Sequence, residues 1–389
     1  TGDVHTNGSL YTGHNTLTLS GKTTYTDTWS IGFMPGDSTH PETPTSPHWA
    51  TGLPPATQQE QQPYGVHLDD YHALIDYTTT TTALDPYRFQ TQAGLVVTVD
   101  ASNKVKIYKK GGGDITNATS GADGNAAVAI KAAITTNGTI TDNREGATTG
   151  NGTVRVATFD VGAFTNKVNG GSLGNNWNGI VYITDLSADP NGVTAKRAIR
   201  LKNGGTLPDG GLTVASANPV YVQGDFNTGT IAPLTPGGVP VLQPASNLGV
   251  TTSPTVLGYT RQPAAIVADA VNILSNSWID SKSGTKPTAA PTTINAAIVS
   301  GNVPTGGGYY SGGVENFPRF LENWGGKAFT YYGSMIQLYQ SQQAIGRWGS
   351  ANVYDAPTRA WYFDTNFVAS PPPGLLASFN YNRSRWYTE

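Results

Sequence analysis

The chain has 389 residues, with 26 acidic and 23 basic side chains, 47 glycines, 25 prolines and no cysteine. A charged fraction of 13% together with 8 Trp, 19 Tyr and 11 Phe excludes intrinsic disorder, and the lack of cysteine excludes disulfide scaffolds and cysteine-ligated metals. The formal charge of −3 argues against attraction of nucleic acid by the whole surface, and no run approaches the roughly 20 apolar residues of a membrane span.

Short runs of β-branched and aromatic residues, separated by Gly, Asn, Asp and Pro, predict a mainly β fold. In chain order, these strand candidates are 95–99, 104–109, 154–161, 180–184 and 198–202. Helical periodicity is limited to the stretches 126–134, 317–324 and 334–345.

Pairs of predicted strands with similar sequence patterns recur in the second half of the chain. We align Val267 with Val214, and the run 271–274 with 220–222. The repeated strand-corner-strand units are 211–225, 264–278, 293–302 and 327–338, and the stretches 2–11, 17–19 and 22–25 supply further strands. Short strands joined by small-residue corners are typical of a parallel β-solenoid.

The predicted fold is therefore a right-handed parallel β-helix (solenoid) with long loop insertions and an aromatic C-terminal cap. An antiparallel sandwich or barrel would also give short, regularly spaced strands, but the repeats show few Asn-Gly or Asp-Gly hairpin turns. The predicted regions are N-terminal strands with a Pro-rich excursion (1–110), a Gly/Asn/Thr-rich insertion (111–178), the solenoid body (179–345) and the cap (346–389).

Basic residues concentrate in two short runs and at the C-terminus. Such clusters can bind phosphates even on a slightly acidic protein, although lysines that alternate along a strand also mark a solvated face. The candidate DNA-binding residues are Lys104, Lys106, Lys109, Lys110, Lys196, Arg197, Arg200, Lys202, Arg383 and Arg385.

Two groups of side chains with oxygen and nitrogen donors are candidate metal sites. The simpler alternative is that these side chains only form hydrogen bonds within loops. All six histidines precede residue 73, and the densest group is His67, Asp69, Asp70 and His72, whose donors suit a divalent cation such as zinc. The turn at Asp185, Asp189 and Asn191 offers oxygen ligands that calcium accepts.

Aromatic residues gather in the last 80 positions, where they predict either a cap on the end of the solenoid or an interaction surface. The candidate interaction residues are Tyr309, Tyr310, Tyr331, Tyr332, Trp348, Trp361 and Trp386.

An enzyme acting on polysaccharides would need paired carboxylates. Acidic residues near predicted strand ends are Asp185, Asp189, Asp225, Asp269 and Asp280. They do not recur at a fixed position of the repeat, so the sequence does not predict that they stack on one face. A nucleophile elbow and a phosphate loop are missing from the sequence, so no catalytic residue is assigned.

Three motifs are GDVHTNGSL at 2–10, VYVQGDFN at 220–227 and ENFPRFLENW at 315–324. With these motifs the chain resembles the extracellular part of large bacterial type IV minor pilins related to PilX, in particular the ComZ-type competence pilins. The resemblance implies a β-solenoid body on a pilus, other pilins as partners, DNA as a ligand during natural transformation, and no catalytic residues. The family's apolar N-terminal helix is absent from the sequence, which implies a longer precursor or a different export route.

The functional hypothesis is thus a non-enzymatic, extracellular minor pilin ectodomain that binds DNA. A surface adhesin or carbohydrate-binding module and a secreted polysaccharide-active β-helix enzyme are the alternatives. No cofactor is expected beyond calcium or another divalent cation.

Overall fold

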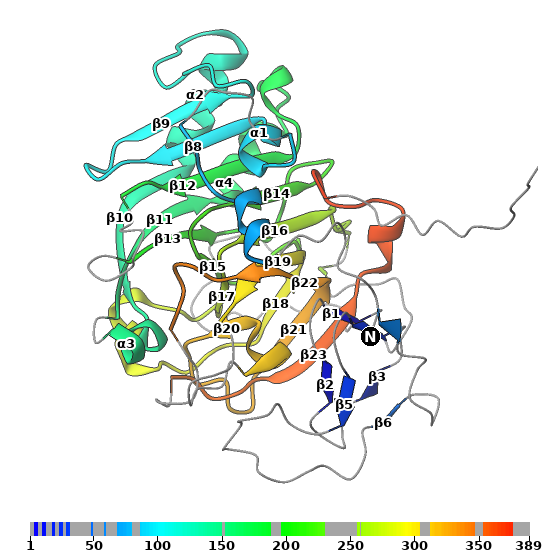
Figure 1. Ribbon diagram of the computed structural model, residues 1–389. Coiled ribbons are helices and arrows are strands. Elements are labelled where there is room, and N and C mark those ends of the chain that lie inside the picture. Colours follow the sequence, from blue (N-terminus) through cyan, green and yellow to red (C-terminus); the bar gives the residue numbers. More distant parts are fainter. Residues whose placement is uncertain are drawn as a thin grey trace, which may run out of the picture.

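A computed structural model describes residues 68–79, 86–149, 152–187, 196–229, 255–256, 258–303, 312–346 and 353–375 (Figure 1). It also gives the bounds of seven short strands between residues 4 and 59. The protein is mainly β, and most of its strands pair in parallel.

The largest sheet has seven strands in the order β22-β19-β16-β14-β12-β8-β9. All neighbours pair in parallel except β8 and β9, which form an antiparallel hairpin at one edge. Its strands are β8 (Leu95–Val99), β9 (Val105–Lys109), β12 (Ile180–Asp185), β14 (Leu212–Ala215), β16 (Ala264–Ala268), β19 (Ala297–Asn302) and β22 (Met335–Gln340).

A six-stranded sheet has the order β10-β11-β13-β15-β17-β20 and is parallel from β11 onward. Its strands are β10 (Ile134–Thr141), β11 (Thr153–Asp160), β13 (Lys196–Lys202), β15 (Val220–Gln223), β17 (Val271–Leu274) and β20 (Pro318–Phe320). A third, three-stranded parallel sheet contains β18 (Thr292–Asn295), β21 (Ala328–Gly333) and β23 (Thr358–Phe363).

The chain visits these three sheets in a repeating order. Strands β16, β17 and β18 lie in the seven-, six- and three-stranded sheets, and β19, β20 and β21 follow the same sequence of sheets. Each visit adds one strand beside the previous one, so neighbours in a sheet come from successive stretches of chain.

The N-terminal strands also pair in parallel. Sheets β1-β4-β7, β2-β5 and β3-β6 contain β1 (Val4–Thr6), β2 (Leu10–Thr12), β3 (Thr18–Leu19), β4 (Thr23–Tyr25), β5 (Trp29–Ile31), β6 (His48–Trp49) and β7 (Gln58–Gln59). The prediction of strands within 2–11, 17–19 and 22–25 is confirmed.

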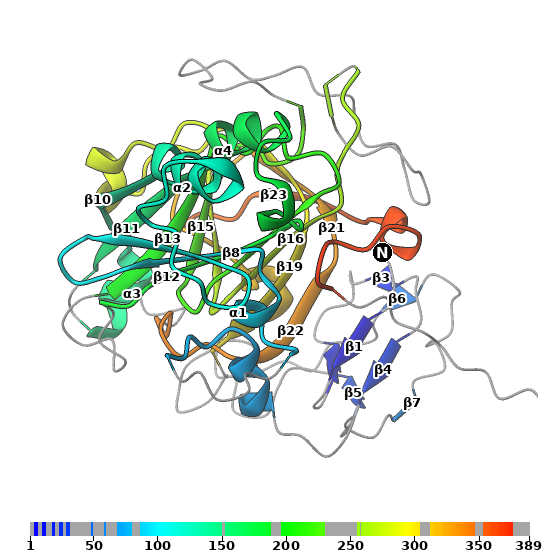
Figure 2. The same cartoon turned by 90° about the horizontal axis from the view of Figure 1, so that it is seen from above.

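In the described residues, the helices between the strands are α1 (Phe89–Gln92), α2 (Gly121–Ala133), α3 (Asn143–Thr149), α4 (Val161–Val168), η2 (Leu68–Leu74), η3 (Gly174–Asn176), η4 (Asp280–Thr285) and η5 (Gly313–Asn316), and η6 (Thr365–Val368) follows β23. Helices α2 and α4 pack on each other and on strands of both large sheets, at the end of the molecule seen from above in Figure 2. Within the described ranges, no helix is long and apolar enough to cross a membrane.

Apolar side chains at equivalent positions of neighbouring strands stack on one another in the interior. In the seven-stranded sheet, one column contains Leu95, Val181, Val214, Ile266, Ile298 and Met335. In the six-stranded sheet, the facing column contains Phe159, Leu201, Val222, Ile273 and Phe320. Burying each such side chain contributes about 1.5–3 kcal/mol, so these columns supply much of the folding energy.

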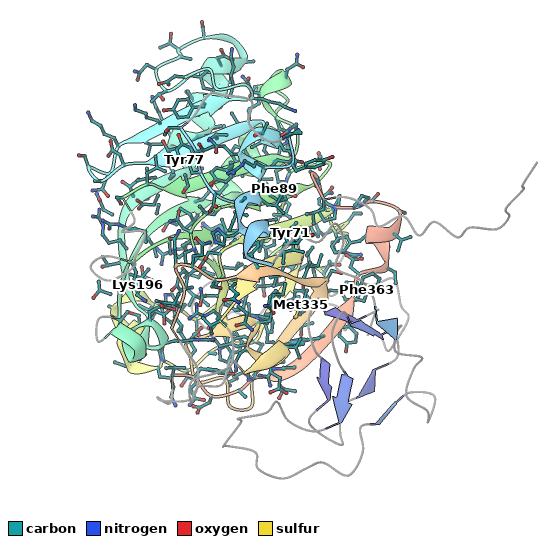
Figure 3. The ribbon with its side chains drawn as sticks, in the orientation of Figure 1. Tyr71, Tyr77, Phe89, Lys196, Met335 and Phe363 are labelled. Carbon is teal, nitrogen blue, oxygen red and sulfur yellow. The ribbon has the colours of Figure 1, made fainter. Side chains whose placement is uncertain are left out.

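The outer face of the seven-stranded sheet is also apolar. Its column of Val96, Tyr182, Ala215, Val267 and Val299 belongs to a second buried cluster. Tyr71, Leu74 and Tyr77 of the N-terminal segment 71–77 pack against this cluster, and so do Phe367 and Leu375. Figure 3 shows Tyr71, Tyr77 and Phe89 along this face. The sheet therefore has both faces buried, as is usual for parallel sheets.

Most predicted strands are confirmed, and all four strand-corner-strand units contain two strands each. Two of the three predicted helices are wrong: 317–324 contains β20 and 334–345 contains β22. Only 126–134 is largely helical, as part of α2. The alignment of Val267 with Val214 is wrong by one residue, because Val214 pairs with Ile266 and Val267 with Ala215.

The stretch 111–178 contributes to the six-stranded sheet. Strand β11 pairs in parallel with β13 over seven residues, and β10 adds an antiparallel edge. The Gly- and Thr-rich composition of this stretch thus reflects turns between elements of the body. Within the predicted cap, β23 extends the three-stranded sheet in register beside β21.

Close backbone packing at Gly333 provides a test of the fold. A Cβ atom there would lie 1.9 Å from the carbonyl oxygen of Ala296, whereas one at Gly284 would lie 3.5 Å from the nearest side-chain atom. We expect Gly333→Ala to lower the free energy of unfolding by about 2–3 kcal/mol, as overpacking does. Gly284→Ala should change it by less than about 0.5 kcal/mol. Urea unfolding followed by tryptophan fluorescence measures both, and equal effects would contradict the described packing.

Candidate functional site

Lys106 and Lys109 of the first basic run lie in the edge strand β9, and Lys104 and Lys110 directly flank it. Lys104, Lys106 and Lys110 are exposed, and Tyr108 lies half-buried between the last two. Alternate residues of a strand point to one side, so these four side chains form one row, which we call the β9 row. Lys109 points the other way and donates to Asp123 of α2 at 2.8 Å.

The hairpin turn before β9 fixes this row. The Asp100 carboxylate accepts from the backbone N–H of Ser102 at 2.8 Å and of Lys104 at 2.9 Å, and Asn103 adopts a left-handed φ of 62°. Asp114 lies close enough to Lys106 for that lysine to help lower its pKa, although hydrogen bonds from Thr116 are the main cause. The β9 row thus lies beside two described carboxylates, Asp100 and Asp114.

The second basic run is mostly buried. Lys196, labelled in Figure 3, pairs with Glu145, and Arg200 donates to Asp280 at 2.6 Å. Arg197 is buried as well, and only Lys202 is exposed. In this conformation Lys196, Arg197 and Arg200 offer no exposed charge to a phosphate. Arg383 and Arg385 lie outside the described residues.

A cluster of buried charges covers the outer face of the six-stranded sheet beneath α3. We call it the ionic cluster, and it consists of Asp142, Arg144, Glu145, Lys196 and Arg319. The sequence interpretation missed all of it except Lys196. Asp142 caps α3 and stands three residues before Glu145, a spacing typical of helix starts that could have located part of the cluster.

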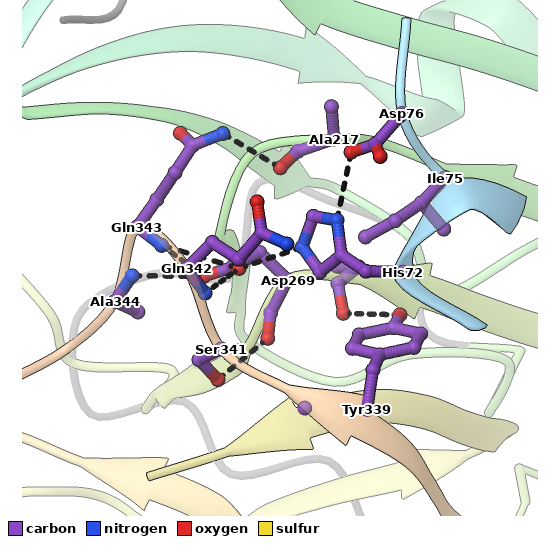
Figure 4. A network of polar contacts seen from close by, with 12 residues as sticks. His72, Ile75, Asp76, Ala217, Asp269, Tyr339, Ser341, Gln342, Gln343 and Ala344 are labelled. Carbon is purple, nitrogen blue, oxygen red and sulfur yellow. Dashed lines mark hydrogen bonds and ion pairs between the residues drawn. The ribbon is translucent and has the colours of Figure 1, made fainter. Parts of the chain in front are cut away.

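His72 lies between two carboxylates (Figure 4). Its Nδ1 is 2.7 Å from the Asp76 carboxylate and its Nε2 is 3.1 Å from the Asp269 carboxylate. Burial alone would lower the pKa of His72, but the hydrogen bonds and charges of Asp269 and Asp76 outweigh it and raise the pKa to about 9. The imidazole is therefore charged at neutral pH and ties η2 to the body.

Asp269 also holds the turn at 341–344. Its carboxylate accepts from the backbone N–H groups of Gln342 at 2.5 Å and Ala344 at 2.8 Å, and from Gln343 at 3.1 Å. Several donors on one carboxylate compensate the cost of burying its charge. One buried aspartate thus joins three segments that are far apart in the sequence.

The predicted metal ligands are only partly described. Both ring nitrogens of His72 already contact carboxylates, and the side chains of Asp69 and Asp70, like all of His67, lie outside the described part. At the calcium candidate, Asp185 is buried and accepts from the N–H of Ser187 at 2.9 Å, while Asp189 and Asn191 are not described. Among described residues, no three His, Asp or Glu side chains are placed to hold a metal.

The predicted aromatic interaction residues separate into buried and partly exposed ones. Tyr331 and Tyr332 are buried, and Trp361 on β23 is half-buried with the Arg359 guanidinium 5.6 Å from its ring. Tyr309, Tyr310, Trp348 and Trp386 are outside the described residues.

Of the carboxylates considered for catalysis, Asp185, Asp225, Asp269 and Asp280 accept hydrogen bonds, and Asp189 lies outside the described residues. Oδ2 of Asp225 is buried without a partner in the described part. Asp225 accepts from the N–H of Thr293 at 2.8 Å, and Asp280 accepts from Arg200 and from the indole N–H of Trp278 at 2.9 Å. A further buried carboxylate, Glu322, accepts from the N–H of Ser275 at 2.7 Å and its hydroxyl at 2.6 Å. These contacts bind corners of the chain together.

Comparisons with protein-family models, curated proteins and solved structures find no match to this chain.

The charged state of His72 predicts a pH-dependent stability. Because its pKa rises from 6.5 to about 9 on folding, its contribution is fully present below pH 6.5 and is lost as the pH rises to about 9. We expect His72→Gln to destabilise the protein by about 3 kcal/mol at pH 6 and by little above pH 9. Urea unfolding of both proteins across this range measures the difference, and a constant difference would contradict the ion pair.

Glu322 has the opposite effect at neutral pH. Burial raises its pKa from 4.5 to about 7 despite the Ser275 hydrogen bonds, so the folded state loses stability as the pH rises from 4.5 to 7. We expect Glu322→Gln to be more stable than the parent at pH 8 and to lose that advantage below pH 4.5. Thermal unfolding at both pH values checks this, and an advantage independent of pH would argue against it.

Proposed function

We propose that the body of this chain is a right-handed parallel β-helix that acts as a non-enzymatic ectodomain of a type IV minor pilin and contacts DNA through the β9 row. The repeating order in which the chain visits three parallel sheets supports the β-helix. Right-handed connections are the rule between parallel strands, which supports the handedness.

The β9 row is the observation that carries the DNA proposal. Three exposed lysines on one side of an edge strand provide phosphate contacts, and Tyr108 among them offers a ring on which a base can stack. The second basic run adds little, since its arginines are buried. We therefore expect a small contact dominated by charge.

The resemblance to minor pilins supports the pilus role and an extracellular location. Its motif at 220–227 begins with β15, and that at 315–324 contains β20, so both concern the scaffold and not an exposed site. The non-enzymatic part is supported by the buried carboxylates, because Asp225, Asp269 and Glu322 all accept backbone hydrogen bonds.

The test is DNA binding by the purified chain across a salt series, measured by fluorescence anisotropy of labelled single- and double-stranded oligonucleotides. Affinity should fall as salt rises, because phosphate contacts release counterions. The triple variant Lys104→Gln, Lys106→Gln, Lys110→Gln should reduce the slope of log affinity against log salt by up to about 3.

A matched control changes three lysines elsewhere. Lys167 and Lys282 are exposed and Lys327 is partly exposed, and none belongs to the candidate DNA residues. Their triple change to Gln should leave the salt slope nearly unchanged. Absence of binding at low salt, or equal losses in the two triple variants, would refute contact through the β9 row.

A further inference from the structure

The β9 row extends from the outer face of the seven-stranded sheet. Tyr108 pairs with Val96 of β8, and its side chain packs against the buried cluster on that face. Every second residue of a strand points to the same side, so the exposed Lys104, Lys106 and Lys110 extend from the outer face as well. The last described residues of the chain also pack on this face, because Leu375 contacts the same cluster.

The end of the described chain is fixed beside β12 and α1. The hydroxyl of Thr213 donates to the carbonyl oxygen of Pro373 at 2.6 Å. A Cβ atom on Gly374 would lie 2.7 Å from Cδ1 of Ile180 and 3.5 Å from the ring of Phe89. The residues that follow position 375 therefore start from the outer face, next to the first residue of β12.

This starting point lies close to one end of the β9 row. The carbonyl oxygen of Ile180 accepts from the N–H of Gly94 at 3.1 Å, and that of Gly94 accepts from the N–H of Lys110 at 3.0 Å. Two strand spacings, about 10 Å in all, separate Ile180 from Lys110. Arg383 and Arg385 lie outside the described residues, eight and ten positions after residue 375. Since a chain can span about 3.3 Å per residue, both arginines are within reach of Lys110.

An exposed aromatic side chain lies in the same region. Tyr87 stands just before α1 and is 64% exposed, whereas Phe89 two positions later is buried in the outer-face cluster. The side chain of Gln92 donates to the carbonyl oxygen of Tyr87 at 2.7 Å, which fixes the backbone there. Helix α1 lies beside β8, the strand that pairs with β9 (Figure 1). No other aromatic side chain in the described ranges is as exposed, so Tyr87 offers the most accessible ring.

We propose that Tyr87, Arg383 and Arg385 continue the β9 row, so that one single-stranded nucleic acid contacts the lysines, the Tyr87 ring and the two arginines. This inference rests on the DNA contact proposed above and specifies the form of DNA that is bound. Unpaired bases can stack on an exposed ring, whereas the bases of a duplex are already stacked on one another. Contacts linked along one strand bind more tightly together than each does alone.

The first experiment measures binding of the full chain to a labelled oligothymidylate and to a duplex of equal length, by fluorescence anisotropy at one salt concentration. Tyr87→Leu should weaken binding of the single strand about tenfold, because it removes one base-stacking ring, and should affect the duplex much less. Tyr87→Trp keeps an aromatic ring and should bind like the parent. Val368→Ser, which changes another exposed apolar side chain, should also bind like the parent.

The second experiment measures the salt dependence of single-strand binding. Arg383→Gln combined with Arg385→Gln should lower the slope of log affinity against log salt by up to about 1.4, because two phosphate contacts are lost. Parent-like binding of Tyr87→Leu and of this double variant would overturn the inference, and a reduced slope in the lysine triple variant would then still support the β9 row. Equal losses for single strand and duplex in Tyr87→Leu would also refute stacking at Tyr87. An unchanged slope in the lysine triple variant, with losses in the other two, would instead refute the β9 row and retain the contact at Tyr87.

Discussion

In-register parallel pairing between successive stretches of chain is the constraint on which the other features depend. Each strand forms backbone hydrogen bonds with its two neighbours in the same sheet, which come from the preceding and the following stretch of chain. Residues at equivalent positions therefore stack into columns. The interior columns are apolar because both large sheets face the same core. The same geometry aligns Tyr221, Asn272 and Arg319 on the outer face of the six-stranded sheet. Buried polar side chains in this column need hydrogen-bond partners and opposite charges. Glu145 of α3 and the carbonyl oxygens of segment 344–346 provide them.

Two buried ionic arrangements fasten peripheral segments to this scaffold in different ways. At His72, one cation lies between two carboxylates, and backbone N–H groups satisfy the rest of Asp269. Beneath α3, the cations exceed the carboxylates, and carbonyl oxygens are the additional acceptors. The first arrangement is complete with the residues of the chain itself, whereas the second leaves the terminal nitrogens of Arg144 without partners in the described residues. Removing one partner from either should cost more than the pair contributes, because it leaves a buried charge behind.

The sequence predicted the strands well and their register in part: the run 271–274 pairs with β15 as aligned, whereas Val267 and Val214 are one residue out of register. Short β-branched runs bounded by Gly and Asn locate β14 to β19 because each run needs only local information. The register of Val214 against Ile266 depends on how the corner between sheets is built, and a shift of one residue would turn every side chain to the other face. The predicted helices 317–324 and 334–345 failed because pairing with β17 and β19 overrode a weak local periodicity. The ionic cluster was hidden because its members come from distant parts of the sequence and charged residues are rarely buried.

These burial patterns change how the basic residues can function. Clustering in sequence suggested two equivalent runs, yet β13 directs Lys196 and Arg200 into contacts with Glu145 and Asp280 on a covered face. Strand β9 lies at the edge of its sheet, and its outward side faces solvent. Lysines on an edge strand also discourage unwanted strand pairing, so the β9 row has a protective role even without a ligand. Tyr108 within the row is half-buried and packs against the apolar cluster on the outer face of the seven-stranded sheet, so this aromatic residue also contributes to the packing of the sheet.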